Sequence, residues 1–313
     1  FDNQAQMELG TPGDGGTNDG WLTRHFLTSP SLPANPPMVQ RIAVSSTIQS
    51  AWLSDTSVVA FANRDDFLFN TGPSAWRDAQ KTSLRNILDL HSAVDPRYAQ
   101  GLVSLDASGF IEQNIPTLSS YVPANGAVYP TGPFGDSLKL TAQLIKLNMG
   151  LRAATLDLGG WDTHNGQGTP ADGQFFWEKI QELSQALAAF YQDLDGVGAN
   201  AFAGRTTVAV MSEFGRRFRE NNDAGTDHGH GGVITVLGGP VVGGLYGSWP
   251  GLANEQLYDA ADLDITTDFR RVLSEIVVSR LENPNWQQVF PGYAGYSPLG
   301  IVRPILFNDG FES

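Results

Sequence analysis

Apolar runs and amphipathic segments alternate through the second half of the sequence, and this alternation constrains the fold more than any other feature. Leu151–Leu158 and Thr206–Ser212 are apolar enough to be strands, and the second is typical of a strand buried on both faces. Between them, residues 175–195 repeat large apolar side chains every three or four positions, which indicates an amphipathic helix. Val233–Leu237 predicts another strand, and 269–281 predicts a late helix. Such alternation predicts an α/β fold, with a mostly parallel sheet flanked by helices.

The first half of the sequence is less regular. Residues 1–38 are rich in Gly, Pro, Asn and Asp, which predicts an extended segment around a short helix near Trp21–Leu27. Val39–Ser45 and Ser57–Ala62 are short apolar runs typical of strands, and 73–112 contains stretches with helical spacing.

The length of the chain fits one large α/β domain or two small ones. A further helix is predicted from Asp136 or Ser137, either of which can cap it, to about Met149. Of the 313 residues, 41% are hydrophobic, which is ample for a sizeable core. We therefore expect a single α/β domain over 39–303, followed by a tail at 304–313.

Charge and cysteine content exclude several functions. The formal net charge is -14, whereas a nucleic-acid partner requires a basic surface, so we expect no nucleic-acid binding. No apolar run approaches the roughly 20 residues that cross a bilayer, so we expect no membrane span. The sequence has no cysteine, so any metal must be held by histidine and carboxylate, which suits Zn, Mn, Mg or Ca.

Unusual residues follow the two predicted core strands, at the end of a parallel sheet where ligands usually bind. The first group lies in GGWDTHN, in which Asp162 and His164 are two positions apart and can turn toward one centre. Ordinary loop hydrogen bonding and metal binding both remain open for this pair. The second group begins with Glu213, at the end of a strand, where an unpaired carboxylate is costly. An ion pair with Arg216 or Arg217 and a metal-ligand role both remain open.

The third group is GTDHGHGG, in which glycines allow the backbone to approach a bound ion closely. Asp227, His228 and His230 are its potential ligands. On a regular strand, side chains alternate between faces, so His228 and His230 share one face while Asp227 points to the other. The two histidines therefore converge more easily with each other than with Asp227. We expect at least one of these imidazoles to lie in a cleft with Asp162 or His164.

Other features have plainer interpretations. His25 and His91 are expected to be ordinary surface or helix histidines. The glycine-rich run at 238–244 lacks a phosphate-cradling pattern and predicts a tight turn. No Gly-x-Ser-x-Gly motif is present, which disfavours a serine hydrolase of the α/β-hydrolase type.

Taken together, the motifs resemble one known family. The strings are FDNQAQMELGTPG, GWLTRHF, LDLGGWDTHNGQ, TTVAVMSEFGRR, GTDHGHGG and TDFRRVLSEIV. Over most of the chain they resemble the domain-of-unknown-function 1501 family. That family is similar to alkaline phosphatases, sulfatases and cofactor-independent phosphoglycerate mutases, and its members usually carry export signals.

The resemblance implies an alkaline-phosphatase-like fold with two divalent ions beyond the parallel strands. It implies metal-ligand roles, with the division between the two ions left open, for Asp162, His164, Glu213, Asp227, His228 and His230. Arg216 is expected to bind the anionic group of the substrate.

The start of the sequence departs from the family pattern. The first family strand and the nucleophile region would precede Phe1, so the catalytic nucleophile is unknown. Phe1–Gln4 has neither an initiator Met nor a signal-like region. We therefore expect a processed or incomplete form, with a separate N-terminal fragment of the same precursor as a partner.

The expected function is an exported metal-dependent hydrolase, periplasmic or extracellular, that cleaves the phosphate or sulfate ester of an anionic small molecule or polymer. The alternative is a non-catalytic secreted structural or surface-binding protein that retains the hydrolase fold. The end of the chain, 307–313, resembles a C-terminal motif of some exported bacterial proteins and favours this alternative, although a loose terminus explains it equally.

Overall fold

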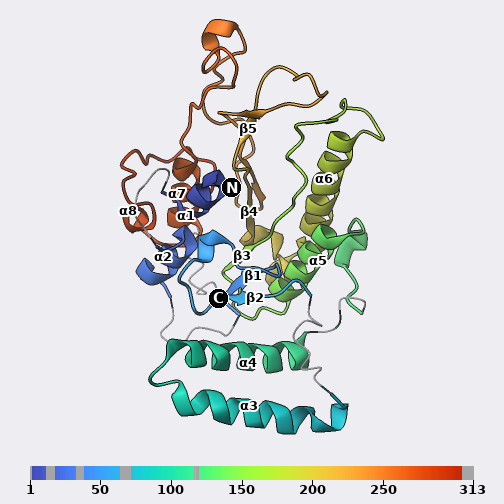
Figure 1. Ribbon diagram of the computed structural model, residues 1–313, viewed down its shortest axis with the longest axis vertical. Helices are drawn as coiled ribbons and strands as arrows, with labels where there is room; N and C mark the ends of the chain where they lie inside the picture. The colour runs from blue at the N-terminus through green and yellow to red at the C-terminus, as the bar shows by residue number, and fades with distance from the viewer. Residues whose placement is uncertain are drawn as a thin grey trace.

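The computed structural model describes residues 2–11, 18–32, 39–63, 72–115, 117 and 120–304. Its architecture is mixed α/β (Figure 1), which confirms the predicted class. Residues 307–313, for which an export-related motif was predicted, lie outside the described residues. No described helix is both long and apolar enough to cross a membrane.

A parallel sheet lies at the centre of the molecule. Its strands are β1 (Arg41–Ala43), β2 (Val59–Ala60) and β3 (Ala153–Thr155), in the order β2-β1-β3. In the register, Ile42 of β1 pairs with Val59 of one neighbour and with Ala154 of the other, both in parallel. Each strand falls within an apolar run that predicted it.

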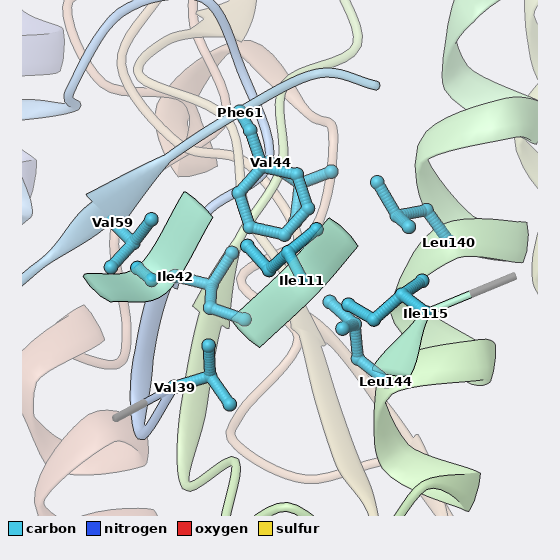
Figure 2. Close-up of a cluster of buried hydrophobic side chains, with 10 residues drawn as sticks. Val39, Ile42, Val44, Val59, Phe61, Ile111, Ile115, Leu140 and Leu144 are labelled. Atoms are coloured by element: carbon cyan, nitrogen blue, oxygen red, sulfur yellow. The ribbon is translucent and has the colours of Figure 1, made fainter. Parts of the chain in front are cut away.

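Two helices pack on this sheet through a buried apolar cluster. In Figure 2, Ile111 and Ile115, from α4 (Pro96–Asn114) and the residue after it, meet Leu140 and Leu144 of α5 (Pro133–Lys146) beside Ile42. All five side chains are at most 1% exposed. The burial of each such side chain contributes roughly 1.5–3 kcal/mol, so this cluster fixes the sheet against both helices.

The remaining helices surround this centre. The helix α3 (Arg77–His91) lies antiparallel to α4 at the foot of the molecule and buries none of its side chains (Figure 1). The long helix α6 (Phe175–Leu194) packs beside α5, as its amphipathic pattern predicts. On the opposite side lie α7 (Phe269–Ser279) and α8 (Trp286–Val289), and the side chain of Asp268 caps α7 by accepting from Arg270 N at 2.9 Å. The described residues also form short 3-10 helices at Ser50–Trp52, Ser74–Trp76, Ala124–Gly126, Gly198–Asn200, Ala203–Arg205 and Asn254–Gln256.

The N-terminal segment is more helical and more buried than expected. It contains α1 (Asp2–Leu9), which was not predicted, and α2 (Trp21–Thr28), which was. His25 lies within α2, in agreement with the helix alternative of its prediction, and it is buried rather than at the surface, with 0% exposure. Its Nδ1 faces the amide of Asn283 at 3.2 Å, because α2 packs under the C-terminal helices.

The strand β4 (Thr207–Val210) differs from its prediction. It pairs antiparallel with β7 (Thr235–Gly238), with Val208 opposite Leu237, and it is not hydrogen-bonded to the parallel sheet. Its residues are half-buried, and Ala209 is exposed, so the prediction of a strand buried on both faces is wrong. Strand side chains point alternately to the two faces of a ladder, and both faces of β4 are only partly covered, which leaves its apolar side chains partly exposed.

Candidate metal centre

The first part of the centre is the loop that leaves the parallel sheet after β3. Along this loop, Asp162 and His164 are exposed while Thr163 between them is 4% exposed. The Thr163 hydroxyl donates to Gln167 Oε1 at 3.0 Å, which anchors the inward-facing residue. With the middle residue turned inward, the aspartate and the histidine both project outward from the same side of the loop.

The second part is a two-stranded antiparallel ribbon, β5 (Gly215–Arg216) and β6 (His228–Gly229), with the loop that joins the two strands. Arg216 pairs with His228 across the ribbon. The ring of His228 stacks on that of Phe214, with centroids 3.8 Å apart and planes at 11°. This contact fixes the plane of the imidazole.

The two parts meet at a single carboxylate oxygen. Asp162 Oδ1 lies 2.7 Å from His228 Nε2 and 3.0 Å from His164 Nε2. One ligand atom from each of these residues lies within 4.8 Å of the other two, so the three could hold one metal ion. The side chains are 43–63% exposed, so solvent and a small substrate can reach them.

The other ring nitrogen of His164 has a partner of its own. His164 Nδ1 lies 3.0 Å from Asp227 Oδ1, so the imidazole is held between two carboxylates. In metal centres, a histidine that binds through one nitrogen commonly donates the other N–H to a carboxylate. Asp227 therefore occupies the position of an orienting residue for His164.

Hydrogen bonds within the cluster lower the pKa values of both carboxylates, Asp162 and Asp227. The hydrogen bond from His228 lowers the pKa of Asp162 below its usual value, and the charges of His164 and Arg216 act in the same direction. The pKa of Asp227 is lowered by its hydrogen bonds to His164 and Asn221. Ionised carboxylates at neutral pH are what a divalent cation requires.

Two of the predicted ligands lie elsewhere. The ring of His230 stacks on Tyr258, with centroids 3.9 Å apart and planes at 11°. Glu213 is half-buried after β4, and its charge only partly offsets the lowering of the pKa of Arg216 by burial. Neither belongs to the group of converging ligand atoms found among the described residues. Their roles as metal ligands stay predictions.

Sequence reasoning missed two residues that join the loops. Asn221 Nδ2 donates to His164 O at 2.9 Å and to Asp227 Oδ1 at 3.1 Å. Gln167 Oε1 accepts from the hydroxyls of Thr163 and Thr226, at 3.0 and 2.7 Å. Amide side chains are common in polar loops, and nothing in their spacing singled these two out.

The comparisons with known proteins place these residues in a family. No curated protein and no solved structure matches the chain significantly. One family model matches residues 116–276, just over half of the 313 residues, and this range includes every predicted site residue. The chain therefore belongs to the family described as "Protein of unknown function (DUF1501)".

Proposed function

We propose that this protein is a metal-dependent hydrolase of phosphate or sulfate esters. The observation that supports the proposal is the convergence of Asp162 and His164, from the loop after β3, with His228, from β6. Catalytic metal sites typically have three protein ligands and an open position, whereas structural sites are closed by four.

The donor set fits a divalent cation. Two imidazole nitrogens and one carboxylate oxygen are ligands that zinc accepts, and manganese also binds such mixed sets. The pairing of His164 Nδ1 with Asp227 leaves Nε2 directed at the centre. We propose one ion at this centre. The second ion that the family resemblance implies remains a prediction.

A divalent cation in this centre would polarise an ester oxygen, activate a nucleophile and stabilise charge on the leaving oxygen. The residues of the chain would supply the geometry: Asp162 and the two imidazoles face solvent, where an anionic ester can approach. The site follows β3 at the carboxyl end of a parallel sheet, the usual place for ligands in α/β folds. This position supports an alkaline-phosphatase-like arrangement, which is part of the proposal. Export to the periplasm or the cell exterior is a separate part of the proposal, and it rests on the family resemblance.

Turnover of two simple substrates tests the proposal. The purified protein is stripped with a chelator, reloaded separately with Zn²⁺, Mn²⁺, Mg²⁺ or Ca²⁺, and assayed with 4-nitrophenyl phosphate and 4-nitrophenyl sulfate. We expect turnover that disappears on chelation and returns with at least one of these ions. Asp162→Asn should abolish it, whereas Asp172→Asn, an exposed carboxylate outside the centre, should leave it unchanged.

The possible outcomes separate the two functions. Metal binding without turnover of either ester would favour the non-catalytic binding protein. Turnover that persists in Asp162→Asn would place the active site elsewhere and contradict the proposal.

A further inference from the structure

The side chain of Arg216 joins the two loops of the metal centre. Its guanidinium donates to Trp161 O through one terminal nitrogen and to Thr226 O through the other. These carbonyls belong to the residues immediately before Asp162 and Asp227. One planar group therefore bonds to both loops one residue ahead of the carboxylate that each contributes.

The same guanidinium also contacts the imidazole side of the centre. Arg216 Cζ lies 4.7 Å from the centroid of the Phe214 ring, whose other neighbour is the ring of His228. Arg216 Nη2 lies 3.5 Å from Asp162 Oδ1. Through these contacts, Arg216 touches one metal-ligand residue directly and a second through a stacked ring.

These contacts use one N–H on each terminal nitrogen of Arg216, which leaves fewer donors of the fork for a substrate anion. Bidentate binding of a phosphate or sulfate requires two parallel N–H groups of the guanidinium fork. Both terminal nitrogens of Arg216 are already bonded to backbone carbonyls, and the side chain is only 19% exposed. The arrangement favours a role inside the protein over a role in gripping the substrate.

We propose that Arg216 is a positioning residue that assembles the metal centre by holding the loops of Asp162 and Asp227 in register. This inference rests on the proposed function, because it assumes that the centre binds a cation. It replaces the expectation that Arg216 binds the anionic group of the substrate.

Because Arg216 is positively charged, the direction in which cation affinity changes in Arg216→Ala distinguishes a positioning role from a purely electrostatic one. A guanidinium stays protonated in proteins, so it repels a cation bound nearby. If charge were its only influence, Arg216→Ala would strengthen cation binding. A positioning role predicts the reverse, a loss of about 10- to 100-fold, as is typical when outer partners of metal ligands are removed.

Titration with Co²⁺ alone shows whether the loss of Arg216 weakens or strengthens cation binding. Wild type, Arg216→Ala and Arg216→Lys are compared, with Arg217→Ala as the matched control because the Arg217 side chain is 52% exposed. We expect weaker Co²⁺ binding and an altered visible absorption spectrum of bound Co²⁺ in both Arg216 variants. Lysine should recover little, since one ammonium cannot reproduce the planar bonding to two carbonyls. Arg217→Ala removes a charge that also acts on Asp227, so it should bind Co²⁺ as tightly as the wild type or more tightly.

The outcomes distinguish this inference from the proposed function. Circular dichroism melting curves show whether each variant is folded, and Arg216→Lys serves if Arg216→Ala is not. Equal or tighter Co²⁺ binding in a folded Arg216 variant, with an unchanged spectrum, would overturn the positioning role alone. Failure of the wild type to bind Co²⁺ would overturn the proposed function and this inference together.

Discussion

His228 and His230 are two residues apart and have different surroundings, which makes them a matched pair for mutation. His228 faces Asp162 at 2.7 Å, whereas the ring of His230 lies against Tyr258. We expect His228→Ala to weaken Zn²⁺ binding by more than the roughly 10- to 100-fold cost of changing an outer partner. His230→Ala should change it only a few-fold. Isothermal titration calorimetry measures both, and equal losses in the two variants would mean that His230 is also a ligand.

The buried His25 predicts a pH dependence of stability. Burial, assisted by the charges of Arg152 and Arg41, lowers its pKa from 6.5 to about 3. Between these values the unfolded chain binds a proton that the folded chain excludes. The free energy of unfolding should therefore fall as the pH falls below about 6.5, by up to about 1.4 kcal/mol per pH unit from this group.

Urea denaturation between pH 7 and pH 5 measures the contribution of His25. His25→Gln should show a shallower decline than the wild type, because the variant has no imidazole to protonate on unfolding. The exposed His91, changed to Gln, is the control and should keep the wild-type slope. Parallel profiles for all three proteins would show that His25 does not titrate between the folded and unfolded states as its burial implies.

At the scale of elements, the two loops of the centre pack through a backbone contact that only glycine permits. A Cβ atom at Gly225 would lie 2.3 Å from His164 O and 2.5 Å from Thr163 O. The clash is with backbone, which cannot rotate away. Next to it, Thr226 N donates to Thr163 O at 3.2 Å, so the contact is continuous along both loops.

We therefore expect Gly225→Ala to destabilise the protein by about 1–3 kcal/mol, the usual cost of overpacking. It should also weaken Zn²⁺ binding, because the loops must separate. Gly159→Ala is the matched control, since a Cβ there meets nothing within 4 Å. Urea denaturation and Zn²⁺ titration of both variants check this. A Gly225→Ala protein as stable as Gly159→Ala, with unchanged affinity, would mean that the loops are not packed this closely.

Element boundaries were predictable where one local signal dominated. The periodic apolar residues of α6 and α7 predicted both helices to within a few residues. The helix α5 begins at Pro133 rather than at the predicted caps Asp136 or Ser137, because proline is well suited to the first helical turn. The pairing of β4 could not be predicted, since its apolar run fits a central strand of a parallel sheet and an antiparallel ladder equally well.

For the whole molecule, the sequence predicted the α/β class and the loops of the site, but not the assembly of the site. Asp162 and His164 were predicted as site residues because they follow an apolar strand, and both lie close to His228. The alternation of side chains along a strand could not predict the position of His230, because β6 comprises only His228–Gly229 and ends before it. Asp227 contacts His164, and Arg216 donates to Trp161 O, across segments that are far apart in the sequence. No local sequence pattern encodes such contacts.

Both proposals depend on the binding of one divalent cation by Asp162, His164 and His228. X-ray absorption spectroscopy of the Zn²⁺-loaded protein, after removal of loosely bound metal, tests it most directly. We expect about one tightly bound Zn²⁺ per chain at this centre, with two imidazole nitrogens and a carboxylate oxygen at about 2.0–2.2 Å. The imidazole signal should be lost in His164→Ala/His228→Ala. Zinc that washes away, or a shell of oxygen ligands without imidazole, would contradict it.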